Sequence, residues 1–260
     1  MLTVLLTFLV ICFMINIPIG FAMGIAALAS LIASGMMPIE MLPQRMVAGI
    51  NSFPLLAIPL FMMAGSIMER GGISKRIVEL ASALVGHFKG GLAAVSVMAC
   101  TFFASISGSA PGTAAAVGEL TIPEMVKRGY SLPYASSVVA SASCLGVVIP
   151  PSITFILFGI VADVSIGRLF IAGILPGVLL ASALVGVSIL RSHQLGYPAE
   201  EKQSWQQRWQ KLLHSFWGIL MPVIILGGIM TGAFTPTESA GIAVVYGLIV
   251  SMFIYKELGW

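Results

Sequence analysis

The chain has 260 residues, of which 58% are apolar and only 9% are charged, with a formal net charge of +3. A soluble domain usually carries about 25% charged residues, so this composition excludes a soluble globular protein and indicates an integral membrane protein. The 13 basic residues are spread thinly along the chain, which excludes the clustered basic surface of a nucleic-acid-binding protein.

Residues 2–33 form an uncharged apolar segment that is longer than one membrane-spanning helix of roughly 20 residues. The segment lacks a basic n-region and is longer than the apolar part of a signal peptide, so we expect it to be retained in the membrane. The run from Asn16 to Gly20 contains Pro18, which should kink the segment or divide it into two helices. A second apolar segment follows at 52–68.

Residues 73–88 have a different pattern. Apolar residues recur there at helical spacing, and charged residues occupy the rest of the helical wheel. The apolar positions are Ile73, Ile77, Leu80, Leu84 and Phe88. This pattern predicts an amphipathic helix that lies along the membrane interface.

Residues 91–126 are apolar but are interrupted by a polar, glycine-rich run at 105–113. Pro111 within this run cannot continue the backbone hydrogen-bond ladder. The arm on each side has about 13 residues, or roughly 20 Å of helix, which is too short to cross a hydrocarbon core of roughly 30 Å. We therefore predict a re-entrant helical hairpin whose polar tip lies inside the membrane. One kinked spanning helix is the alternative.

A second interruption, at 146–152, divides the apolar segment 132–162. The adjacent prolines Pro150 and Pro151 remove two amide donors and disfavour helix at Ile149. The pattern predicts a broken helix that is unwound within the membrane.

Three further apolar segments predict spanning helices. They cover residues 169–190, 216–230 and 240–255. The long polar segment between the first two, 191–215, is expected to be a cytoplasmic loop.

The basic residues indicate the orientation in the membrane. If the hairpin enters and leaves on one face, eleven of the 13 basic residues lie on that face, and only Arg45 and Arg168 lie on the other. The positive-inside rule then places the entrance of the hairpin in the cytoplasm. If residues 91–126 crossed the membrane once, Lys89 and Lys127 would lie on opposite faces and the bias would weaken.

The two polar interruptions predict a cation site. Broken membrane helices coordinate Na⁺ through unwound carbonyls, and both interruptions offer only oxygen atoms. The tip, Ser107 to Ser109, supplies hydroxyls and carbonyls, and the run from Gly146 to Pro151 supplies carbonyls that lack amide donors. The alternative is that these serines and glycines only allow helices to pack closely.

The remaining polar residues do not indicate an enzyme. The chain has no P-loop, and the residues around Ser109 do not form a nucleophile elbow. Glu119 is the most deeply placed acid, and it either has a function or approaches the cytoplasmic interface. Asp163 and Glu238 fall near the ends of spans, where a solvated or helix-capping role is expected.

Several short motifs occur together along the chain. They are Ile58-Pro59-Leu60-Phe61, Gly71-Gly72-Ile73, the run 102–114, Ile122-Pro123-Glu124-Met125, Gly129-Tyr130, the run 146–152, Gly173-Ile174-Leu175-Pro176-Gly177 and Pro236-Thr237-Glu238-Ser239-Ala240. In this order they resemble the large membrane subunit of the tripartite ATP-independent periplasmic (TRAP) transporters, of the DctM type.

The resemblance implies an all-α polytopic membrane protein of the bacterial inner membrane. It implies an elevator-type secondary transporter of organic acids, such as C4-dicarboxylates or sugar acids, with Na⁺ as coupling ion and no other cofactor. The implied partners are a small four-helix membrane subunit and a periplasmic substrate-binding protein. Members of the family have two inverted repeats, each with one re-entrant hairpin and one unwound helix.

Residues 1–260 resemble the first three-fifths of such a protein, with a second repeat that begins at about residue 216. We therefore expect a truncated transporter domain that is inactive by itself. The alternative is a scaffold that docks a partner subunit and transports nothing.

The resemblance and the two interruptions together define the candidate site residues. One Na⁺ site and one wall of the substrate cavity would be formed by Ser107, Gly108 and Ser109 together with the run from Gly146 to Pro150. Within that run the candidates are Gly146, Val148, Ile149 and Pro150, and the expected Na⁺ ligands are Ser107, Ser109, Gly146 and Ile149. Asn51 and Ser52 are further candidates for the cavity, or they form a helix cap.

Overall fold

The computed structural model describes residues 1–35, 38–199 and 202–259, and every regular element in that part of the chain is a helix. The chain divides into two compact units, Met1–Ser52 and Phe53–Trp260, and each unit is described by itself.

The first unit contains two packed apolar helices, α1 (Leu2–Met14) and α2 (Ile19–Ser34), followed by α3 (Met41–Ile50). The chain reverses between α1 and α2 because Asn16 adopts a left-handed φ of 64° and Pro18 is the N-cap of α2. The expected division of the first apolar segment is therefore confirmed. Small residues such as Ala22 and Ala26 are buried between the two helices.

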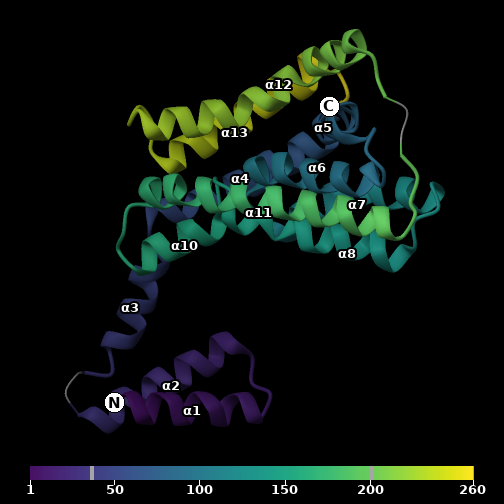
Figure 1. Ribbon diagram of the computed structural model, residues 1–260. Helices are drawn as coiled ribbons and strands as arrows, with labels where there is room; N and C mark the ends of the chain where they lie inside the picture. The colour runs from purple at the N-terminus through teal and green to yellow at the C-terminus, as the bar shows by residue number, and fades with distance from the viewer. Residues whose placement is uncertain (36–37, 200–201, 260) are drawn as a thin grey trace. The chain divides into compact units, whose positions relative to one another are not determined.

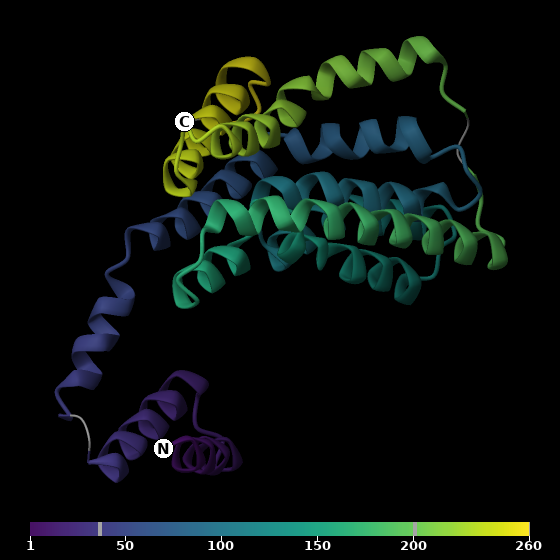
Figure 2. The ribbon, with the colours of Figure 1, turned by 60° about the vertical axis from the view of Figure 1, so that its left-hand side comes forward.

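The second unit is a helical bundle, shown from two sides in Figures 1 and 2. Its first helices are η1 (Phe53–Leu56), α4 (Ala57–Arg70), α5 (Ile73–Val85), α6 (Gly91–Ser107) and α7 (Ala110–Lys127). The others are α8 (Leu132–Ser143), α9 (Leu145–Val148), α10 (Ile153–Val161), α11 (Ile166–Gln194), α12 (Trp205–Met230), α13 (Pro236–Ile249) and the π-helical turn η2 (Val250–Ile254).

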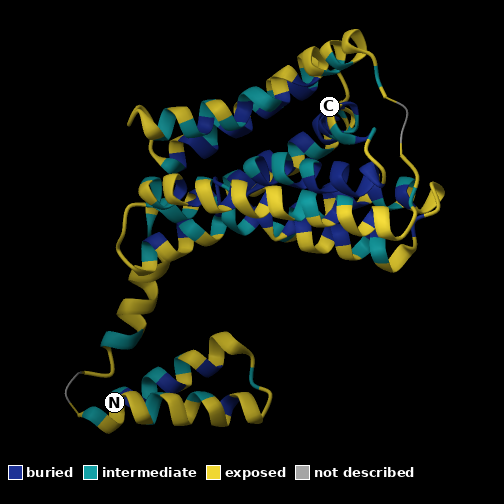
Figure 3. Ribbon diagram, viewed as in Figure 1, coloured by how far each residue is buried: buried dark blue, intermediate teal, exposed yellow. Residues whose placement is uncertain are grey.

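Helix α6 lies at the centre of this bundle. Of its 17 residues, 13 are buried, and it packs against α5, α7, α8, α9 and α11. Figure 3 shows this burial as dark blue, whereas α11 and α12 present exposed faces. The sequence suits this position, because α6 has no charged residue and is rich in Gly, Ala and Ser, small residues that let neighbouring helices approach closely in a membrane protein.

The helical hairpin is present as α6 and α7, which fold back on each other. The arms have 17 and 18 residues, about 26 and 27 Å of helix, and are longer than the sequence predicted. The polar run does not end the helices early, because Pro111 lies in the first turn of α7, where its missing N–H is not needed. Only Gly108 and Ser109 remain outside both helices.

Helix α5 is amphipathic, and part of its predicted apolar face is buried in the bundle. Ile73, Ile77 and Leu80 are buried, whereas Leu84 and Phe88 are exposed and Phe88 lies beyond the end of the helix; α5 packs against α6 and α12. The sequence pattern predicted the helix, and its position along the membrane interface stays a prediction. The packing partners, which come from distant segments, were not predicted.

Four helices are long and apolar enough to cross a membrane, among the described residues, and the bent pair α8–α10 makes a fifth if it counts as one span. The spanning helices α11 and α12 are longer than predicted, so residues 191–194 and 205–215 of the expected loop are helical. Helix α12 starts early because Ser204 and Gln207 form a capping box, with the Gln207 N–H donating to Ser204 Oγ at 3.3 Å.

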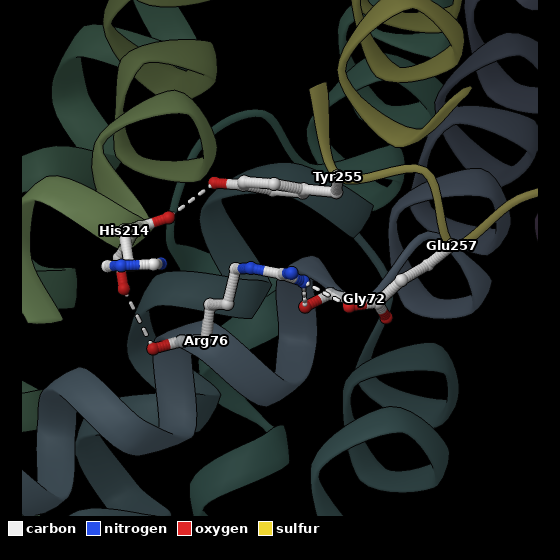
Figure 4. Close-up of polar contacts among 6 residues, drawn as sticks. Gly72, Arg76, His214, Tyr255 and Glu257 are labelled. Carbon is white, nitrogen blue, oxygen red and sulfur yellow. Dashed lines mark hydrogen bonds and ion pairs between the residues drawn. The ribbon is translucent and has the colours of Figure 1, made fainter. Parts of the chain in front are cut away.

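A polar cluster joins α5 to α12 and to the end of the described chain (Figure 4). The Arg76 guanidinium lies 3.8 Å from the centre of the Tyr255 ring, pairs with Glu257 at 2.7 Å and donates to the Gly72 carbonyl at 2.9 Å. The Tyr255 hydroxyl donates to the carbonyl of His214 on α12 at 2.7 Å. Arg76 and Tyr255 together therefore join three segments that are distant in sequence.

We expect Arg76→Ala to lower the free energy of unfolding by about 1–3 kcal/mol, because it removes a cation–π contact and charge-assisted hydrogen bonds. The matched control is Lys75→Ala, which changes an exposed neighbour on the same helix and should stay within about 0.5 kcal/mol of wild type. Denaturant unfolding in detergent micelles measures both values. Equal stability of the two variants would contradict this role for Arg76.

Candidate functional site

The tip of the hairpin is a tight turn between α6 and α7. Gly108 adopts a left-handed φ of 62° and ends α6, a conformation that glycine adopts without steric cost. Ser109 has an extended backbone and is the N-cap of α7, where its Oγ accepts the Gly112 N–H at 3.3 Å. The sequence Gly-Ser-x-Pro thus ends one helix and starts the next within two residues.

Three hydroxyl-bearing residues surround the turn. Ser107 Oγ lies 3.1 Å from Thr113 Oγ1, and its contacts with the backbone of Ser109 are 3.4 Å long. Thr113 Oγ1 also donates to the Ser109 carbonyl at 2.8 Å. Ser107 and Thr113 are buried, so the tip presents a compact group of oxygen atoms inside the protein.

The helix that follows the hairpin is interrupted at the predicted place. Helix α9 ends at Val148, residues 149–152 are not helical, α10 begins at Ile153, and the two halves meet at a 40° bend. Pro150 and Pro151, which are joined by a cis peptide bond, have no N–H to donate to the carbonyls one turn earlier. One of these carbonyls, that of Val147, accepts the Ser152 hydroxyl at 2.6 Å instead.

The tip and this break are in direct contact. The Ile153 N–H donates to the Gly108 carbonyl at 3.1 Å. Gly146 packs so closely on the tip that a Cβ at this position would lie 2.8 Å from the carbonyl oxygen of Ser109. A Cβ on Gly108 would likewise lie 2.7 Å from the Pro151 carbonyl oxygen. Two glycines, one in each interruption, therefore allow the two backbones to meet.

The tip lies beside the middle of a spanning helix. A Cβ on Gly65 of α4 would be 3.1 Å from the Cβ of Ser107. Gly65 lies within about 5 Å of the midpoint of the candidate span Phe53–Arg70 along its axis. The C-terminal end of α6 thus lies beside the middle of the candidate span that contains α4, and not beside an end of that span.

The predicted break residues contact two different neighbours. Gly146 lies against the tip, whereas the carbonyl oxygen of Val148 lies against α11, where a Cβ on Gly173 would be 2.6 Å from it. Ile149 also packs on α11, next to Gly177. The coordinating roles predicted for Val148, Ile149 and Pro150 stay predictions, and these contacts show that α11 is part of their surroundings.

Asn51 and Ser52 end the first unit; Asn51 is the C-cap of α3, and neither residue is the N-cap of α4. Asn51 is exposed and Ser52 is partly buried. Helix α4 has Leu56 at its N-cap, with no side-chain hydrogen bond there. Their predicted place in the cavity stays a prediction.

A cavity of about 210 Å³ opens next to the tip on the side of α4. Its walls include Ser107 and Ser109 of the tip and Ser66 and Glu69 of α4. The sequence did not predict Glu69 as a site residue, because the predicted apolar segment 52–68 ends at Met68. An acid one turn after Ser66, at the end of an apolar run, is the signal that could have indicated it.

The other acids lie away from the tip. Glu119 is exposed on α7, and Asp163 is exposed in the turn after α10. Glu238 forms a capping box with Thr235, whose N–H donates to the Glu238 carboxylate at 2.8 Å. This geometry confirms the predicted capping role of Glu238.

The atoms that the tip and the break present are hydroxyl and carbonyl oxygens. Among the described residues, no group of three or more His, Cys, Asp or Glu side chains could hold a metal ion. Neutral hydroxyl and carbonyl oxygens are ligands that bind hard monovalent cations in membrane proteins. The buried Ser107 hydroxyl, with contacts of 3.1–3.4 Å only, has lone pairs that suit such an ion.

Residues 6–260 match the family described as tripartite ATP-independent periplasmic transporter, DctM component. The chain is 42% identical over 261 residues to the isethionate TRAP transporter permease protein DctMQ of Oleidesulfovibrio alaskensis. The matched region covers 99% of this chain and 41% of that protein. It is 37% identical over 257 residues to the C4-dicarboxylate TRAP transporter large permease protein DctM of Rhodobacter capsulatus, covering 94% and 58%.

A third relative is the 2,3-diketo-L-gulonate TRAP transporter large permease protein YiaN of Escherichia coli. It is 41% identical over 244 residues, which are 94% of this chain and 57% of that protein. The chain therefore spans about half the length of the curated relatives it matches.

Proposed function

The chain belongs to the DctM family of tripartite ATP-independent periplasmic transporters, and from this premise we propose that it forms the ion-binding half of a Na⁺-driven uptake system for small organic acids. Its relatives are transporter permeases and not enzymes, and the chain is a multi-pass membrane component of such a transporter. The coupling ion, the substrate class and the mechanism are the proposed part.

One observation carries the proposal: the hairpin tip is seated on the helix break, level with the inner part of α4. Two irregular backbone segments that meet inside a membrane protein are tolerated where they line a site. Ser107 and Ser109 would hold Na⁺ at this junction together with the backbone of Gly146 and Ile149. The ion would supply positive charge next to the cavity in which an anionic substrate binds.

The substrate class follows from the relatives. Their printed names refer to isethionate, C4-dicarboxylates and 2,3-diketo-L-gulonate, all of which are small organic anions. We assign the same class to this chain. The partners would be a small membrane subunit and a periplasmic binding protein in the bacterial inner membrane, with the hairpin open to the cytoplasm and an elevator movement that carries the site across.

Uptake by proteoliposomes tests this function. The completed transporter is defined here as residues 1–260 followed by the C-terminal remainder of the Rhodobacter capsulatus relative, with that relative's small subunit and binding protein. An imposed Na⁺ gradient should drive uptake of a labelled C4-dicarboxylate into these vesicles. Residues 1–260 without the remainder should give no uptake above empty vesicles, because transport needs both halves of the site.

Two results would contradict the proposal. Uptake that is the same with Na⁺ and with K⁺ would exclude Na⁺ coupling. A folded completed transporter that takes up no organic acid would favour the scaffold alternative.

A further inference from the structure

The cavity beside the hairpin tip contains a single formal charge among its described lining residues. This charge is the carboxylate of Glu69 on α4, a partly buried side chain. The residues outside the described ranges are methionine, glutamate and tryptophan, so none of them could add a positive charge. Although Arg70 follows it directly, the Glu69 carboxylate forms no ion pair and no hydrogen bond with any described side chain. Its negative charge is therefore unpaired within the described part of the chain.

Glu69 lies within the candidate membrane span Phe53–Arg70. It is the second-last residue of that span, roughly 11 Å from the midpoint along the axis, whereas half of a hydrocarbon core is roughly 15 Å thick. A carboxylate at this depth is costly without a partner and indicates a functional position. Because Glu69 lines the cavity together with the hydroxyl-bearing residues Ser66, Ser107 and Ser109, a bound ligand in the cavity can serve as its partner.

The two helix ends at the tip contribute opposite partial charges. Helix α6 ends at Ser107 and places its partial negative charge at the tip, whereas α7 begins at Ala110 and places its partial positive charge there. The hydroxyls of Ser107 and Ser109 are neutral and can face either a cation or an anion. The carboxylate of Glu69 is thus the group that decides the sign of the ligand.

We infer that Glu69 gives the ion site at the tip its negative charge and makes the adjoining cavity select a cation over an organic anion. The inference rests on the proposed function, since the tip must hold the coupling ion. A cavity of about 210 Å³ is roughly 7 Å across, and over that distance a carboxylate strengthens the binding of a monovalent cation roughly 10- to 50-fold, the lower value applying to a partly exposed group. Glu69 attracts the ion without having to touch it, and the organic anion binds away from Glu69.

Thermal unfolding of residues 1–260 in detergent tests the inference through binding alone. Na⁺ is titrated against choline at constant ionic strength, because an ion that binds the folded state raises the melting temperature. The wild-type chain should show a saturable rise. Glu69→Gln should need roughly ten times more Na⁺ for half of that rise, whereas Glu69→Asp keeps the charge and should stay within about three-fold of wild type. The melting temperature in choline alone shows that each variant is folded.

Uptake by the completed transporter gives a second measurement. In proteoliposomes, Glu69→Gln should raise the Na⁺ concentration for half-maximal uptake by the same factor. The KM for the dicarboxylate at saturating Na⁺ should not change, because the anion binds away from Glu69. The matched control is Glu119→Gln, which removes an exposed carboxylate of the same hairpin that does not line the cavity and should change neither value.

The results separate a failure of this inference from a failure of the proposed function. A wild-type chain whose melting temperature does not respond to Na⁺ would overturn the ion site and this inference with it. A wild-type response that is unchanged in Glu69→Gln would overturn the role of Glu69 alone and leave the proposed function standing. Equal weakening in Glu69→Asp and Glu69→Gln would show that the shape of the side chain matters and not its charge, and would also overturn the inference.

Discussion

The Gly146→Ala variant should lose both stability and transport, although alanine is normally the better helix former. A Cβ at this position would lie 2.8 Å from the backbone carbonyl of Ser109, and a backbone atom cannot move aside as a flexible side chain can. Overpacking of this kind costs about 1–3 kcal/mol. The tip must therefore move away from the break. We expect Gly146→Ala to lower the rate of Na⁺-driven uptake by the completed transporter as well as the free energy of unfolding.

Gly186→Ala is the matched control for this variant. Gly186 is also helical, and a Cβ there would meet no atom within 4 Å, so alanine should be neutral or stabilising by up to about 1 kcal/mol. Unfolding in micelles and uptake in proteoliposomes compare the two. If both variants behave alike, Gly146 does not hold the tip against the break.

Ser107→Ala and Ser109→Ala should each raise the Na⁺ concentration that gives half-maximal uptake. A lost coordination contact or charge-assisted hydrogen bond costs about 1–3 kcal/mol, which corresponds to a roughly 5- to 150-fold weaker affinity for Na⁺. The maximal rate at saturating Na⁺ should change less, because the hydroxyls bind the ion and the backbone of the tip stays in place.

Ser182→Ala serves as the control for the tip serines. Its exposed hydroxyl donates only to the Val178 carbonyl one turn earlier, so the Na⁺ dependence should not move. Unchanged Na⁺ dependence in both tip variants would mean that these serines serve close packing and not ion binding.

Local sequence signals predicted the elements of the site. Helices begin or break at Pro18, Pro111 and the Pro150–Pro151 pair. Proline has no backbone N–H to donate, whatever its position in the membrane. Glycine in a polar run predicted the turn at Gly108. Element boundaries were less accurate, since Ser105 and Thr113 donate back to backbone carbonyls and remain in their helices.

Long-range contacts could not be predicted from the sequence. Nothing in the local pattern of Gly65, Gly146 or Gly173 shows which backbone each approaches, because the contact depends on how separate helices pack. The same holds for Glu69, which reaches the cavity beside the tip only after α4 packs against α6. The apolar face of α5, buried at Ile73, Ile77 and Leu80, shows the limit of amphipathic patterns, which predict a face but not the helices that pack on it.

Cysteine accessibility tests the re-entrant hairpin most directly. In a background without Cys12, Cys100 and Cys144, single cysteines replace the exposed residues Lys89 and Lys127, at the two open ends of the hairpin, and the exposed Arg168 as a reporter of the other face. The cysteines at 89 and 127 should react with a membrane-impermeant maleimide from the cytoplasmic side only, and the cysteine at 168 from the opposite side only. Labelling of positions 89 and 127 from opposite sides would show that residues 91–126 cross the membrane once and would contradict the hairpin.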